Sequence, residues 1–155
     1  MSEKTNVMRV LEQKKVNYKS YFYQNDSTLS GIEVAALLKQ NPAQVFKTLV
    51  TVGKSKKNYV FVIPVTEELD LKKAAITVGE KAIEMVKAKE LLPLTGYVHG
   101  GCSPIGMKKF FPTFFHKTAV EFETIFFSAG KIGCQVEVRL EELKQAITYQ
   151  IAEIV

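Results

Sequence analysis

The 155-residue chain is 46% hydrophobic and 24% charged, which fits one domain over residues 1–155 and excludes a disordered or low-complexity protein. Its net charge of +5 is a mild lysine excess, compatible with an anionic partner such as RNA but also with an ordinary solvated surface. Two cysteines are too few for a disulfide framework, and no signal peptide or membrane-spanning stretch is recognisable. We therefore expect a cytoplasmic protein without membrane association.

The expected elements follow from apolar spacing and from cap and turn residues. A capping box at Ser30-Gly31-Ile32-Glu33, the pair Asn41-Pro42 and Asp70 each predict the start of a helix or turn. In chain order we expect a helix (5–15), a strand (18–23), a helix (30–40), a turn (42–45), a strand hairpin (47–52 and 59–65), two short helices (71–76 and 79–85), one more turn (88–92), three strands (112–116, 123–128 and 134–138) and a last helix (140–149). Because helices and strands interleave irregularly, the chain predicts one α+β domain around a curved sheet.

Residues 95–106 form the most irregular stretch, with four glycines and one proline. Consecutive glycines at Gly100-Gly101 allow backbone N–H groups to turn inward, and such donors suit the oxygen that becomes negative during acyl transfer. The stretch is neither a Walker phosphate loop nor a Gly-x-Ser-x-Gly nucleophile elbow. A structural crossover loop explains the pattern equally well.

Lys47 lies between a turn and an apolar strand, so its ammonium could point into a cleft and bind a carbonyl oxygen or a phosphate. An exposed edge-strand lysine is the simpler interpretation of this position alone. Ser128-Ala129-Gly130 could line a tight pocket at the end of a strand, although an ordinary strand exit gives the same pattern.

A thiol nucleophile at Cys102 would need a base, and His99 is three residues away. Loop residues at that spacing need not face each other, so the pattern does not favour this pair. Cys134 resembles a small core residue and His116 a structural one. No metal-ligand spacing links the two histidines to the cysteines, so we expect no metal site.

Five segments together resemble the YbaK branch of the editing deacylases, a family related to the editing domain inserted in bacterial prolyl-tRNA synthetase. The resemblance covers nearly the whole chain, and the Gly-x-x-x-Pro element at Gly100–Pro104 is its most specific part. Lys108-Lys109 is typical of the YbaK branch. The carrying segments are 46–49, 69–75, 95–109, 121–125 and 128–133.

The resemblance implies a barrel-like curved mixed sheet with surrounding helices, and an enzyme, a hydrolase or lyase, that cleaves the ester between an amino acid and the 3′ end of tRNA. YbaK-type proteins remove cysteine from tRNA(Pro), often beside prolyl-tRNA synthetase, and Cys-tRNA(Cys) is a further expected substrate. The family's lysine corresponds to Lys47 and its oxyanion-binding backbone donor to Gly101. The implied substrate pocket contains Tyr23, Ser30, Thr48, Gly100, Ser103, Pro104 and Ser128.

Two positions depart from the family pattern. Ser30 stands where relatives have an aromatic residue, and Cys102 stands where the family usually has an aliphatic one. The resemblance implies substrate-assisted chemistry, in which the thiol of the misloaded cysteine attacks its own ester, and no cofactor. Two alternatives stay open: a non-catalytic module that binds tRNA or a synthetase, and a deacylase for a different aminoacyl-tRNA. Lys54, Lys56, Lys57, Lys108 and Lys109 are candidate tRNA contacts.

Overall fold

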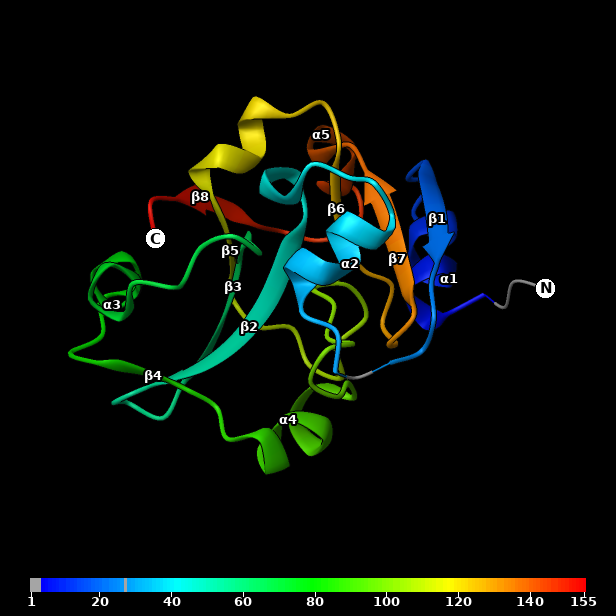
Figure 1. Cartoon of the computed structure of the whole chain (residues 1–155). Coiled ribbons are helices and arrows are strands. Elements are labelled where there is room, and N and C mark those ends of the chain that lie inside the picture. Colours follow the sequence, from blue (N-terminus) through cyan, green and yellow to red (C-terminus); the bar gives the residue numbers. More distant parts are fainter. Residues whose placement is uncertain (1–3, 27) are drawn as a thin grey trace.

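The protein, as a computed structural model, is described for residues 4–26 and 28–155, and its strands form two sheets (Figure 1). The smaller sheet has the order β1-β7-β6 and is antiparallel throughout. The larger has the order β4-β2-β3-β5-β8, with antiparallel pairs around β2 and parallel pairs around β5. The strands are β1 (Tyr18–Phe22), β2 (Phe46–Gly53), β3 (Asn58–Pro64), β4 (Ile83–Met85), β5 (Thr113–His116), β6 (Ile125–Ser128), β7 (Cys134–Val138) and β8 (Gln150–Ala152).

Helices cover these sheets and begin where the sequence places caps. Thr5 accepts a hydrogen bond from the Met8 N–H, the Ser30 capping box forms, and Asp70 accepts from the N–H groups of Lys72 and Lys73 at 3.0 Å. These contacts satisfy N–H groups that a helix start leaves without partners. The helices are α1 (Asn6–Gln13), α2 (Gly31–Leu37), α3 (Leu71–Val78), α4 (Ala88–Thr95) and α5 (Leu140–Leu143), with 3₁₀ turns η1 (Pro42–Gln44) and η2 (Lys117–Glu121).

The core lies on both sides of β3, as expected for a central strand. Val60 and Val62 point to a large cluster that contains α1 and both sheets, whereas Phe61 and Ile63 point to a second cluster under α3. All four side chains are fully buried. Because successive strand residues face opposite sides, an unbroken apolar run is what such a position needs.

The α+β class is confirmed, but the barrel is not. The described strands form two open sheets, which meet where Val45 bridges Phe126. β2 is long and strongly bent in the view of Figure 1, so the predicted curvature lies in the larger sheet.

Four predicted helical segments are wrong in type or length. The segment 79–85 contains β4, which pairs with the last three residues of β2, and Gly79 ends α3 in the left-handed conformation. The helix expected over 140–149 ends at Leu143, and the missed strand β8 follows at 150–152. The helix expected to reach residue 40 ends at Leu37, while α4 continues through Pro93 to Thr95. At β4 and β8, strand pairing outweighs local helix spacing.

Candidate active site

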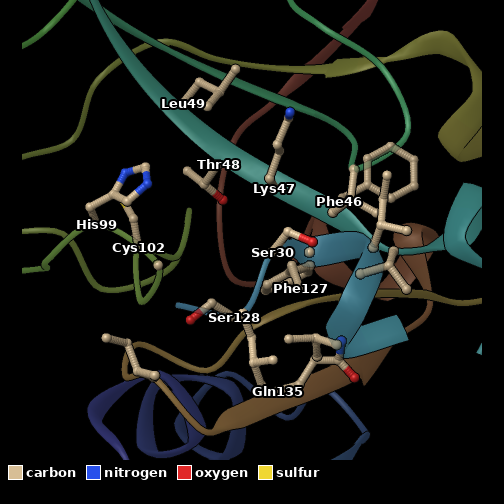
Figure 2. Close-up of a pocket in the computed structure, with 18 of the residues that line it drawn as sticks. Ser30, Phe46, Lys47, Thr48, Leu49, His99, Cys102, Phe127, Ser128 and Gln135 are labelled. Carbon is tan, nitrogen blue, oxygen red and sulfur yellow. The ribbon is translucent and has the colours of Figure 1, made fainter. Parts of the chain in front are cut away.

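A cavity of about 540 Å³ lies beside β2 and is closed by α2, by the β4–α4 connection, by the glycine loop and by β6–β7 (Figure 2). Its walls are mainly apolar, since Phe46, Val50 and Phe127 are buried there. A concave, apolar site with a few polar groups is the usual form of a small-molecule pocket, and this volume lies within the usual range. The predicted residues that line it are Tyr23, Ser30, Lys47, Thr48, Gly100 and Ser128.

Lys47 is a cationic residue of the cavity lining, and Figure 2 shows its ammonium on the other side of β2 from the Thr48 hydroxyl, Ser30 and Ser128. It is the second residue of β2, pairs in register with Ile63, and is half-buried. Among the described residues no carboxylate forms a salt bridge with its ammonium, so the charge has no internal counterion. A cation in an apolar surrounding acts strongly on a nearby anion or developing oxyanion, because little solvent screens it.

Thr48 adds a polar group that has no partner. Its Oγ1 is buried and, among the described residues, no group is within hydrogen-bonding range. Figure 2 shows this hydroxyl on the same side of β2 as Ser30 and Ser128. A buried hydroxyl without a partner costs free energy, so it is a natural contact for a polar ligand atom.

The glycine loop contributes Gly100 and Cys102 to the cavity, whereas Gly101, Ser103 and Pro104 are buried and are not among the described lining residues. The Gly101 N–H donates to the Val98 carbonyl at 3.0 Å, within the loop. A Cβ at Gly101 would lie 3.0–3.1 Å from the backbone of Lys131 and Ile132, so glycine allows this close approach. The Cys102 N–H has no acceptor among the described residues.

The hydroxyls of Ser30 and Ser128 are already used for local structure. Ser30 Oγ accepts from the Glu33 N–H at 3.1 Å as part of the cap of α2. Ser128 Oγ accepts from the Gly130 N–H at 3.1 Å. Tyr23 follows β1, and burial raises the pKa of its phenol, which therefore stays a neutral hydroxyl. In both serines the oxygen accepts, so each hydroxyl proton, like that of the neutral Tyr23 phenol, is still available to donate to a ligand.

Cys102 and His99 both line the cavity but form no hydrogen bond to each other in the described structure. Burial raises the pKa of the Cys102 thiol to about 12, so the group is neutral and a poor nucleophile. Cys134 is a fully buried core residue of β7, as its sequence context predicts. His116 is also buried, and its Nδ1 accepts from the Ile154 N–H at 3.3 Å.

Sequence reasoning missed Gln135. It is 4% exposed, lines the cavity, and accepts a hydrogen bond from Gln40 Nε2 at 2.7 Å. The available signal was alternation in β7, where Cys134, Val136 and Val138 face the large core and Gln135 faces the opposite side.

Over residues 4–26 and 28–155, no group of three or more His, Cys, Asp or Glu side chains could hold a metal ion. The same part of the chain contains no helix that is long and apolar enough to cross a membrane.

A comparison with models of protein families shows to which family the chain belongs. Residues 27–146 match the model of the aminoacyl-tRNA editing domain. The chain belongs to this family. The chain is 48% identical, over 98% of its length, to the Enterococcus faecalis protein named "Putative Cys-tRNA(Pro)/Cys-tRNA(Cys) deacylase EbsC", and the match covers 93% of that relative. The resemblance to the YbaK group is thereby confirmed.

Two solved structures share the fold of this editing domain. One is a hypothetical protein, with a TM-score of 0.87 and 20% identity over 96% of this chain and 97% of that chain. The other is described as "a putative trans-editing enzyme for prolyl tRNA synthetase", with a TM-score of 0.82 and 24% identity over 96% of this chain and 93% of that chain. At these identities the two structures establish the fold and no more.

Proposed function

We propose that this protein is an aminoacyl-tRNA deacylase that acts in trans on Cys-tRNA(Pro) and, by the same chemistry, on Cys-tRNA(Cys). Membership of the editing family and the name of the 48% identical relative support an ester of tRNA as the substrate. The observation that carries the proposal is that Lys47 and the glycine loop line one apolar cavity, whose size suits an aminoacyl group with its ribose.

The reaction needs no protein nucleophile. The thiol of the substrate cysteine loses its proton to water, its sulfur forms a bond to the ester carbonyl carbon, and the bond from that carbon to the ribose oxygen breaks. The ribose oxygen takes up a proton and leaves as the tRNA hydroxyl. The released cyclic thiolactone then reacts with water to give cysteine. Alanine and proline lack the thiol, so the same cavity leaves their esters intact.

The task of the protein is to position the ester and to stabilise the negative charge that develops on its carbonyl oxygen. Lys47 is the proposed cation for this oxygen. The second donor is a main-chain N–H of the glycine loop, which the family resemblance assigns to Gly101. The Gly101 N–H donates to Val98, so this assignment requires it to exchange that carbonyl for the substrate oxygen. The Cys102 N–H is the neighbouring donor that needs no such exchange.

The expected partners are the aminoacylated 3′ end of tRNA and prolyl-tRNA synthetase, which would hold tRNA(Pro) after mischarging. We place the protein in the cytoplasm, where these substrates are made. No cofactor takes part in the proposed chemistry.

The test is release of labelled cysteine from Cys-tRNA(Pro) and Cys-tRNA(Cys), with Pro-tRNA(Pro) and Ala-tRNA(Pro) as substrates that lack the thiol. We expect release from the two cysteinyl esters only, and trapping of the thiolactone with a strong amine nucleophile. Binding of tRNA without release of cysteine would instead support a non-catalytic module. Release of alanine at a comparable rate would contradict the substrate-thiol mechanism.

A further inference from the structure

The two rims of the cavity carry opposite charge. Among the described residues, two exposed large apolar side chains line the cavity and mark its mouth. They are Ile32 on α2 and Met85 on β4, at 49% and 43% exposure. α2 and η1 lead into the first residue of β2, whereas β4 pairs with its last three residues. The rims therefore lie toward opposite ends of β2.

The β4 rim is basic. It consists of the tip of the β2–β3 hairpin, β4 and the start of α4. Residues 54–57 and 80–90 contain six lysines against three glutamates. None of the six lysines forms a salt bridge within the described chain, and all are exposed. They are Lys54, Lys56, Lys57, Lys81, Lys87 and Lys89.

The hairpin tip is held against the start of β4 by hydrogen bonds. The Lys54 N–H donates to the Ala82 carbonyl at 3.0 Å, and Glu80 accepts from the Ser55 N–H at 3.1 Å and from the Tyr59 hydroxyl at 2.8 Å. Gly53 makes room for this carboxylate, because a Cβ there would lie 2.2 Å from the Glu80 carboxyl carbon. Glu80 thus anchors the tip beside the residues that precede β4, so the lysines of the hairpin lie next to Lys81.

The α2 rim has the opposite character. Residues 20–38 contain no lysine or arginine, and they include Asp26 and Glu33. Asp26 lines the cavity and accepts hydrogen bonds from Thr28, which lower the pKa of its carboxyl, so it is ionised at neutral pH. An RNA phosphate is repelled from this rim and attracted to the β4 rim.

We propose that the acceptor stem of the tRNA docks on the β4 rim, with its 3′ end crossing Met85 into the cavity; this inference rests on the proposed deacylase function. RNA fits the surface better than a protein does. Protein interfaces are depleted of lysine and enriched in aromatic and arginine side chains, and residues 54–57 and 80–82 expose lysines and no aromatic ring.

The experiment compares two triple variants with the same change of charge. The basic-rim triple is K54Q/K81Q/K87Q, and the control triple is K14Q/K15Q/K19Q at α1 and β1, where no residue from 4 to 22 lines the cavity. Binding of tRNA(Pro) that carries no amino acid is titrated over a range of salt concentrations. The basic-rim triple should lose affinity on the order of tenfold or more, and its log–log salt slope should fall by about one per lysine that contacts a phosphate. The control triple should keep both the affinity and the salt slope of the parent protein.

A second measurement separates the effect of the rim lysines on tRNA binding from any effect on ester cleavage. We compare kcat/KM for Cys-tRNA(Pro) with kcat/KM for a cysteinylated CCA trinucleotide, which has no acceptor stem. The ratio of the two should fall for the basic-rim triple and not for the control triple. The single variants K54Q, K81Q and K87Q, each with an unchanged thermal midpoint, guard against loss of folding in the triple.

Equal losses in both triples, or no loss in the basic-rim triple, would overturn the docking proposal. So would a basic-rim triple that keeps its affinity for tRNA but no longer binds prolyl-tRNA synthetase, since the surface would then contact a protein. A parent that releases no cysteine from Cys-tRNA(Pro) would remove the proposed function, and the tRNA titration would still test the rim by itself.

Discussion

Lys47 has a different environment from the other lysines that the sequence singles out. It is a half-buried residue of the cavity lining without a salt-bridge partner in the described chain, whereas the six lysines of the β4 rim are exposed. Screening by water makes an exposed charge weak, and its absence makes a cavity charge strong. In our two proposals, lysine thus serves two roles, stabilisation of charge at Lys47 and attraction of phosphates on the rim.

We expect Lys47→Ala to lower kcat/KM for Cys-tRNA(Pro) by about 10²–10³, the usual effect of removing one oxyanion donor. The matched control is Lys14→Ala, which removes an exposed lysine after α1 that lies outside the cavity. The measurement is single-turnover release of labelled cysteine. A Lys47→Ala enzyme that matches the parent rate would remove this lysine from the mechanism.

Cys102→Ala should keep the rate of cysteine release within a few-fold of the parent, because the thiol, with its pKa raised by burial to about 12, is neutral at working pH. The check is the pH profile of kcat/KM from pH 6 to 9 for both proteins, which should have the same shape. An inflection present in the parent and absent in Cys102→Ala would show that this thiol ionises in the reaction.

At the scale of single elements, α2 connects local sequence chemistry to the site. The capping box that begins it is complete, with Ser30 Oγ accepting from Glu33 N and the Glu33 carboxylate accepting from Ser30 N at 2.8 Å. Val34 of α2 and Ser30 itself line the cavity. A shift at the start of this helix therefore changes the mouth of the cavity.

Ser30→Ala should destabilise the protein by about 1 kcal/mol, the typical cost of losing a helix cap, whereas Ser30→Thr should restore most of the loss because threonine also caps. Urea unfolding measures the free energy of unfolding, and cysteine release measures the site. If Ser30 acts through the helix, activity follows stability across the two variants. Loss of activity in Ser30→Thr at parental stability would instead indicate direct contact with the substrate.

At the scale of the whole molecule, the C-terminal segment joins elements that are far apart in sequence. β8 pairs with β5, the Ile154 carbonyl accepts from the Asp70 N–H at 2.8 Å, and His116 accepts from the Ile154 N–H. Glu153 pairs with Lys73 on α3 and with Lys117 on η2. The end of the chain thus holds α3 to the far side of the larger sheet from α1.

His116 makes this arrangement sensitive to acid. Burial, with help from Lys117, lowers the pKa of the folded imidazole below its ordinary value of 6.5. Well above pH 6.5 the His116 imidazole is neutral in both the folded and the unfolded chain, so it does not change the free energy of unfolding. As the pH falls below 6.5 the unfolded chain binds the proton first, so the free energy of unfolding should decrease until the folded His116 also protonates.

The measurement is urea unfolding at steps from pH 7.5 to 5.5. His116→Gln should flatten the dependence, whereas His99→Gln, at the other and exposed histidine, should leave it unchanged. A dependence that persists in His116→Gln would assign it to other groups.

The sequence by itself determined the features that depend on near neighbours. The caps at Ser30 and Asp70 and the β2–β3 hairpin form as expected, because each needs residues only a few positions apart. Local context made Lys47 a candidate and the family resemblance added Thr48 and Tyr23, and all three residues line one cavity.

Only the tertiary structure decided which groups meet and which are already bonded. Residues 83–85 form β4 because they pair with the edge of β2, and Gln135 faces the cavity because its neighbours in β7 face the large core. The Gly101 N–H is bonded to Val98, and Ser103 and Pro104 are buried outside the lining. Burial, strand pairing and the absence of a counterion depend on residues far away in the chain, so no local pattern encodes them.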